Sequence, residues 1–141
     1  MSTADNKAIL QRAMDNFTKG NRDAYLSLYD TNCVLHGYGL PPGIESIKQF
    51  YHGFWTAFPD AHLTSEDMVA EGDKVACRFV VHATHRGEFM GVPATGKRVT
   101  FTGITILRFA GGKCVERWSD ADFLGLMQQL GAVPPPGQAG G

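Results

Sequence analysis

The chain has 141 residues, 43% hydrophobic and 19% charged, with a formal net charge of −1 at pH 7. This balance is typical of one soluble globular domain and excludes the strongly basic surface that nucleic-acid binding requires. No stretch approaches the roughly 18 consecutive apolar residues of a membrane span. The N-terminus, MSTADNKAIL, lacks the basic segment and apolar run of a secretory signal. We therefore expect a cytoplasmic protein with no membrane or nucleic-acid partner.

The cysteines also favour a cytosolic protein. There are three of them, an odd number: Cys33, Cys77 and Cys114. They are widely spaced, and each lies in an apolar, strand-like stretch. Buried, reduced thiols explain that pattern better than a disulfide or a zinc site.

Helical spacing of apolar residues predicts helices over 5–19, 22–29 and 44–58, with a short strand over 33–37 between the last two. Gly20-Asn21 ends the first helix, since glycine takes the left-handed conformation of a helix C-terminus at little cost. Phe58-Pro59 ends the third, because the residue before a proline avoids the helical region.

After Pro59 the hydrophobic period changes to two, which predicts strands over 61–70, 75–89, 98–109 and 114–119. The separators EGDK, GVPATGK and AGGK are short, so neighbouring strands should pair antiparallel as a meander. A last helix is expected over 122–130. We expect one domain over 1–132 and a loose Pro/Gly tail over 133–141.

Helices followed by a long antiparallel sheet indicate an α+β fold with the helices on one sheet face. A curled sheet around the third helix can leave a cavity with an aromatic wall. The candidate wall residues are Phe17, Phe50, Phe54, Trp55, Phe58, Phe79, Phe89 and Phe101. The alternative, that these side chains simply fill a core, stays open.

Three stretches carry a family resemblance: PPGIESIKQFYHGFWTAFPD, THRGEFMGVPATGKRVTF and LRFAGGKCVERWSDADFLGLMQQLG. Together they resemble the SnoaL-like polyketide and ester cyclase family over residues 8–132. The resemblance implies an NTF2-like cone, with a curled antiparallel sheet wrapped around three N-terminal helices and a short C-terminal helix. It also implies a homodimer through the outer sheet face, a small hydrophobic or aromatic ligand, and no metal or cofactor. The same fold hosts cyclases, isomerases, hydrolases and pockets without catalysis.

The family's cyclases use a carboxylate in the last strand as acid and base for an intramolecular aldol ring closure. An ungapped alignment through the Gly-Lys turn and the QLG ending places that position at Ser119. Pocket positions that carry imidazoles in a cyclase fall at Arg117 and Thr105. The sequence thus departs from the family pattern at its central catalytic residue.

Strand alternation predicts that Val115, Arg117 and Ser119 share one face and that Asp120 lies on the other. A bulge at the strand end would turn Asp120 inward. Asp122, just before the last helix, is expected to cap that helix.

The candidate catalytic residues are therefore Asp120, His85 and His36, although a structural role is an alternative for each histidine. The candidate ligand-binding residues are Arg117, Ser119, Thr105, Phe17, Phe50, Phe54, Phe58 and Phe101.

Two functions follow. In the first, the protein is a cofactor-free cyclase, lyase or isomerase for a small carbonyl compound, and Arg117 with Ser119 holds an enolate oxygen. In the second, the protein is a ligand-binding or accessory protein without catalysis, and Arg117 binds an anionic ligand. An acidic side chain inside the cone favours the first function; Arg and Ser without a base favour the second.

Overall fold

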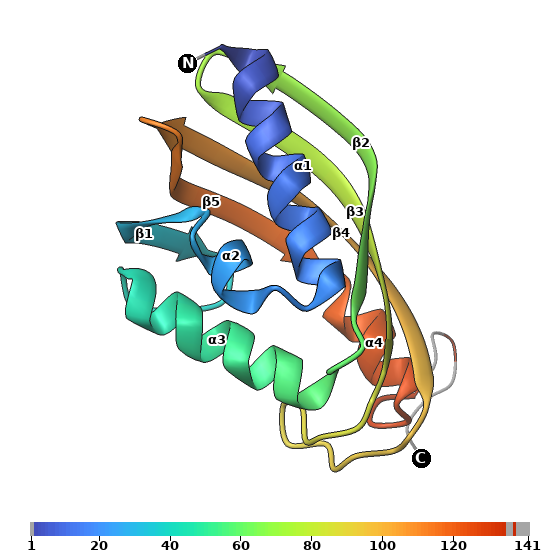
Figure 1. Cartoon of the computed structure of the whole chain (residues 1–141). Helices are drawn as coiled ribbons and strands as arrows, with labels where there is room; N and C mark the ends of the chain where they lie inside the picture. Colours follow the sequence, from blue (N-terminus) through green and yellow to red (C-terminus); the bar gives the residue numbers. More distant parts are fainter. Residues whose placement is uncertain (1, 135–136, 138–141) are drawn as a thin grey trace.

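The computed structural model describes residues 2–134 and 137. The elements are α1 (Thr3–Lys19), α2 (Arg22–Leu26), β1 (Tyr29–His36), α3 (Ile44–Ala57), β2 (His62–Glu71), β3 (Lys74–Thr84), β4 (Arg98–Ala110), β5 (Lys113–Ala121) and α4 (Phe123–Gln129). Of the tail predicted over 133–141, residues 135–136 and 138–141 lie outside the described residues. The α+β class is confirmed, with a curled, unclosed five-stranded sheet and helices on its concave side (Figure 1).

Both long helices form where the periodicity predicts them. At the start of α1, Ser2 Oγ accepts from the Asp5 backbone N–H at 3.1 Å, and an Asp5 carboxylate oxygen accepts from the Ser2 backbone N–H at 3.1 Å. The helix ends at Gly20, whose φ of 80° is left-handed. The second helix is shorter than predicted, because the chain enters β1 at Tyr29, opposite Cys114 of β5.

The sheet order is β1-β5-β4-β3-β2, and β2 to β5 form the predicted antiparallel meander. The sequence did not indicate that β1 would add a fifth strand, parallel to β5. The strand predicted over 75–89 was too long. It ends at Thr84 because the next residues form a loop against α3, where the Arg86 N–H donates to the Ala57 carbonyl at 2.8 Å.

The two sheet faces differ sharply. Along β4, buried and exposed residues alternate over most of the strand, and the inner face packs on the helices. All three cysteines are buried free thiols, as predicted. The outer face exposes apolar side chains instead: Val69 is 65% exposed, Ile104 57% and Ile106 38%.

Asp122 caps α4, as predicted: its Oδ1 accepts from the Gly125 N–H at 2.8 Å. We expect Asp122→Ala to lower the free energy of unfolding by about 0.5–2 kcal/mol, because a backbone donor in the first turn loses its acceptor. Urea titration measures this. Asp120→Ala, which removes a neighbouring exposed carboxylate, is the control and should change stability little. Equal losses in the two variants would contradict the capping role.

Candidate ligand-binding site

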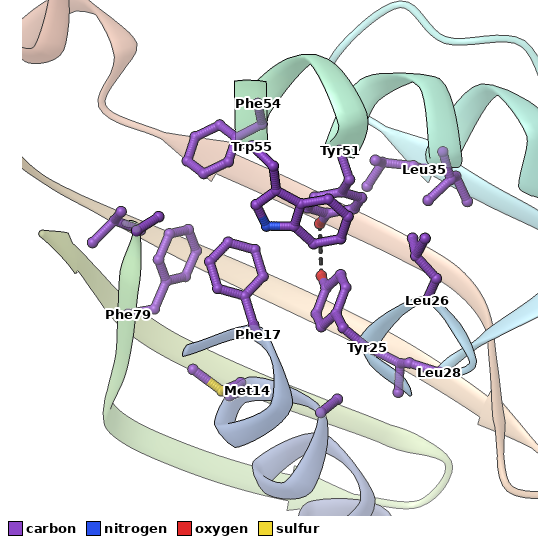
Figure 2. Packing of buried hydrophobic residues seen from close by; sticks show 14 of the residues in the cluster. Met14, Phe17, Tyr25, Leu26, Leu28, Leu35, Tyr51, Phe54, Trp55 and Phe79 are labelled. Atoms are coloured by element: carbon purple, nitrogen blue, oxygen red, sulfur yellow. Dashed lines mark hydrogen bonds between the residues drawn. The ribbon is translucent and has the colours of Figure 1, made fainter. Parts of the chain in front are cut away.

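A cavity lies inside the cone, between the inner sheet face and helices α1, α2 and α3. Its volume is about 50 Å³, and its walls are mostly aromatic. Figure 2 shows Tyr25 and Tyr51 joined by a hydrogen bond, with Phe17 and Trp55 beside them. The lining residues are Phe17, Tyr25, Tyr38, Phe50, Tyr51, Phe54, Leu63, Phe79, Val81, Phe101, Arg117, Ala121 and Phe123.

Arg117 is the only charged residue of this lining. Its strand pairs regularly with β4 from Glu116 to Ala121, which turns the Arg117 side chain inward. Its Nε donates to Thr105 Oγ1 at 2.7 Å, and Thr105 Oγ1 in turn donates to the Trp118 carbonyl at 3.0 Å. The guanidinium is therefore held in one orientation from its strand side.

Three phenols hold the other side of the guanidinium. Nη1 of Arg117 lies within hydrogen-bonding distance of three hydroxyls and shares its two hydrogens among them: Tyr25 at 3.1 Å, Tyr29 at 2.5 Å and Tyr51 at 2.9 Å. The three hydroxyl oxygens lie 2.6–3.0 Å from one another, so each phenol can donate its proton to the next. No described residue accepts a hydrogen bond from Nη2, the remaining terminal nitrogen.

The electrostatics leave a net positive charge in the cavity. Burial raises the pKa of Tyr29 and of Tyr51, and the nearby Arg117 offsets this only in part, so both phenols stay neutral. Burial alone would lower the pKa of Arg117, but the oxygens of Tyr29, Tyr51 and Tyr25 favour the cation and raise it. The lining contains neither a carboxylate nor an imidazole.

Ser119 also faces inward, but it lies behind the cavity wall. Its Oγ accepts from the hydroxyl of Tyr38 at 3.0 Å, and Tyr38 is the residue that lines the cavity. Gly37 makes this approach possible: its φ is 102°, and a Cβ there would lie 2.4 Å from the Ser119 carbonyl oxygen.

Asp120 lies on the outer sheet face, opposite Ile104, and is exposed. The strand has no bulge at this point that would turn it inward. The irregularity is earlier: Cys114 pairs with Phe109 and Glu116 with Arg108, so β5 carries one extra residue, Val115. The prediction that Val115 shares a face with Arg117 and Ser119 is therefore wrong; Cys114 is the buried residue at that end of the strand.

His36 also lies outside the cavity. Its ring stacks on Trp118, with centroids 5.3 Å apart and an interplanar angle of 13°. Its Nε2 lies 2.9 Å from a Glu116 carboxylate oxygen, and Arg108 pairs with the other oxygen at 3.1 Å. The hydrogen bond with His36, helped by Arg108, lowers the pKa of Glu116. The three side chains form a polar cluster on the sheet, half-open to solvent.

His85 is fully buried, but it is not a lining residue. Its Nδ1 accepts from the Thr95 N–H at 3.2 Å and lies 2.9 Å from Thr95 Oγ1. The ring packs on Phe58, which is also fully buried. These contacts hold the loop between β3 and β4 against the end of α3.

Of the candidate ligand-binding residues, the structure brings Phe17, Phe50, Phe54, Phe101 and Arg117 to the cavity. Thr105 and Ser119 contact lining residues from behind, and Phe58 lies in the core. Sequence reasoning missed the tyrosines. A signal existed in α3, where Tyr51 shares the buried stripe of Ile47 and Phe54, because a buried phenol needs a hydrogen-bond partner.

Within residues 2–134 and 137, no helix is long and apolar enough to cross a membrane. The same part of the chain contains no group of three or more His, Cys, Asp or Glu side chains placed to hold a metal ion.

Comparison with known proteins gives consistent matches. Residues 8–130 match the family model described as SnoaL-like polyketide cyclase. The chain is 32% identical over 137 residues to aklanonic acid methyl ester cyclase DauD of a Streptomyces species (strain C5), covering 90% of the chain and 82% of DauD. It is also 32% identical over 76 residues to aklanonic acid methyl ester cyclase DnrD of Streptomyces peucetius; this match covers 54% of the chain and about half, 52%, of DnrD.

Two solved structures agree closely with the fold. AclR of Streptomyces galilaeus superposes with a TM-score of 0.87 at 32% identity, covering 95% of this chain and 85% of AclR. TsrD of Streptomyces laurentii superposes with a TM-score of 0.85 at 25% identity, covering 94% and 99%.

Proposed function

Because the chain belongs to the SnoaL-like polyketide cyclase family, we propose that its cavity binds a small aromatic or polyketide-like molecule through an anionic oxygen, without a carboxylate base of its own. One observation carries this proposal: a buried arginine cation, surrounded by neutral phenols, in a cavity lined by no carboxylate and no imidazole.

The physical argument starts from the cost of burying a charge. A buried cation is costly unless an opposite charge or good acceptors compensate it. Thr105 and the three phenols occupy Nε and Nη1 of Arg117, and Nη2 is left for a ligand. A carboxylate, phenolate or enolate oxygen would form a charge-assisted hydrogen bond there. The aromatic walls favour flat rings, which pack by stacking or edge contacts.

A matched pair of probes tests the proposal. 2-Naphthoate and 2-naphthamide have nearly the same shape, but only the first is an anion. Calorimetric titration should give at least about tenfold tighter binding of 2-naphthoate, because only the anion compensates Arg117. Equal affinities for the two probes would contradict the proposal.

The second candidate function is cyclisation, which the similarity to DauD over most of the chain favours. In such a reaction a proton leaves a carbon between two carbonyls. The enolate carbon then bonds to a further carbonyl carbon of the same molecule, and that carbonyl's oxygen takes up a proton. Arg117 would stabilise the enolate oxygen. Because no lining residue is a carboxylate or an imidazole, the proton would have to leave to solvent.

Turnover of aklanonic acid methyl ester tests this second function, with wild type and Ser119→Asp compared by chromatography. Cyclisation by the wild type would establish the second function. Cyclisation by Ser119→Asp alone would show that the missing carboxylate separates this chain from active cyclases. If neither protein turns over the ester but the wild type binds 2-naphthoate, the first function, ligand binding without catalysis, is supported.

The outer sheet face supports a homodimer. Val69 of β2 and Ile104 and Ile106 of β4 expose apolar side chains there, and Ala76 of β3 pairs with both Val69 and Ile106, so these side chains lie near one another. A second copy of the chain would bury that surface. We expect sedimentation to show a dimer at micromolar concentration, and a monomer there would contradict this assignment.

A further inference from the structure

A second hollow lies next to the cavity. It is a surface groove of about 560 Å³, bordered by α3, the loop between β3 and β4, and the start of α4. Four side chains line both the groove and the cavity: Tyr38, Phe50, Phe54 and Phe123. One layer of aromatic rings therefore separates the two spaces.

That separating layer contains the less buried part of the cavity's aromatic wall. Tyr38, Phe50 and Phe123 are half-buried, whereas Phe54 and the other aromatic lining residues are buried. The rings of Tyr38 and Phe50 stack in parallel, with centroids 4.8 Å apart, and Phe123 packs on Tyr38 at 5.7 Å. A single side-chain hydrogen bond, to Ser119 Oγ, ties Tyr38 to the sheet. These rings can move at lower cost than the core rings behind them.

The size of the cavity makes such movement necessary. A volume of about 50 Å³ is well below the roughly 150 Å³ of a cavity that holds benzene. A ligand ring therefore fits beside Arg117 only if the lining side chains move apart. Because Tyr38 and Phe123 line both spaces, turning them aside would join the cavity to the groove.

We propose that Tyr38 and Phe123 form an aromatic gate, and that the cavity and the groove together bind one elongated, multi-ring anion. This rests on the proposed function, since it places the anionic end at Arg117. The outer rings then lie in the groove, against Phe89 and Met90.

The chemistry of the groove fixes this orientation. Met90 is 66% exposed and has a φ of 48°, a left-handed value that costs energy for a residue other than glycine. This conformation presents a large, adaptable apolar side chain at the groove. The groove's charged lining residue is Glu88, which repels an anion. The anionic end therefore belongs in the cavity and the apolar end in the groove.

Three probes of increasing length test the combined site: benzoate, 2-naphthoate and anthracene-2-carboxylate. Calorimetry should show affinity rising by about tenfold or more from one ring to three, because the added rings leave water for apolar surface. Met90→Glu should reduce the ratio of three-ring to one-ring affinity by about tenfold. Leu124→Glu also replaces an exposed apolar side chain with glutamate, but on α4 and in neither lining; it is the control and should leave that ratio unchanged.

The gate has a kinetic signature. Tyr38→Phe keeps the ring but removes the hydrogen bond to Ser119. Stopped-flow tryptophan fluorescence, to which Trp55 contributes beside Tyr51, should show association and dissociation of 2-naphthoate both accelerated several-fold. Unchanged rates would overturn the gate.

The outcomes separate this inference from the function on which it rests. If 2-naphthoate binds more tightly than 2-naphthamide, but affinity does not rise with ring number and Met90→Glu has no effect on the ratio, the combined site is wrong and the anion-binding cavity stands. If the naphthoate and naphthamide affinities are equal, the proposed function itself fails.

Discussion

Replacing Arg117 with methionine should weaken the binding of 2-naphthoate by about a hundredfold and leave the weak binding of 2-naphthamide nearly unchanged. A hydrogen bond to a charged group contributes about 1.5–3 kcal/mol, and the low dielectric of the cavity places this bond toward the upper end. Methionine keeps much of the side-chain volume but removes the charge. The anion would then enter an apolar cavity with no cation to compensate it.

Two further variants make the Arg117 experiment specific. Arg108→Met removes an arginine from the neighbouring strand, where it pairs with Glu116 on the outer face, and should not change binding. Arg117→Lys keeps the charge but loses the planar fork, so it should restore only part of the affinity. Circular dichroism confirms the fold of each variant. Wild-type affinity for 2-naphthoate in Arg117→Met would remove this residue from the site.

Phe58→Ala should lower the free energy of unfolding by about 3–5 kcal/mol, the usual cost of deleting a large ring from a packed core. Phe58 is fully buried, and its ring centroid lies 5.1 Å from those of Phe54 and Phe89 and 5.5 Å from that of His85. Urea titration measures the loss.

Phe123→Ala is the matched comparison, since Phe123 is a half-buried wall residue of the cavity. It should cost less stability than Phe58→Ala and have the larger effect on ligand affinity. If Phe58→Ala instead caused a small loss of stability and a large loss of affinity, Phe58 would be a cavity residue, as the sequence predicted.

Local sequence patterns predicted most of the secondary structure. The 3.6-residue period predicted α1 and α3 to within a few residues, because each helix buries one apolar stripe. The period of two and the short Gly-containing turns predicted the meander from β2 to β5. Asp122 was identified as a cap for the same reason: capping depends on a few neighbouring residues and hardly on the rest of the chain.

Local sequence patterns did not predict the features that depend on contacts between distant segments of the chain. The third strand was predicted too long because its apolar residues continue past Thr84, while contacts with α3 turn the backbone into a loop. β1 joined the sheet through parallel pairing with a strand some 80 residues later, and no local pattern encodes that partner.

The sequence by itself determined the fold class and the family resemblance, and it predicted that Ser119 takes the place of the family's catalytic carboxylate. Only the tertiary structure decided which polar side chains meet. Regular pairing from Glu116 to Ala121 kept Asp120 on the outer face, and the pairing of β1 with β5 placed His36 beside Trp118, outside the cavity. Packing of α2, β1 and α3 brought Tyr25, Tyr29 and Tyr51 around Arg117. Each of these tyrosines is an ordinary aromatic residue in its own segment. Their common role arises because a buried guanidinium needs acceptors, and the fold supplies them from three separate elements.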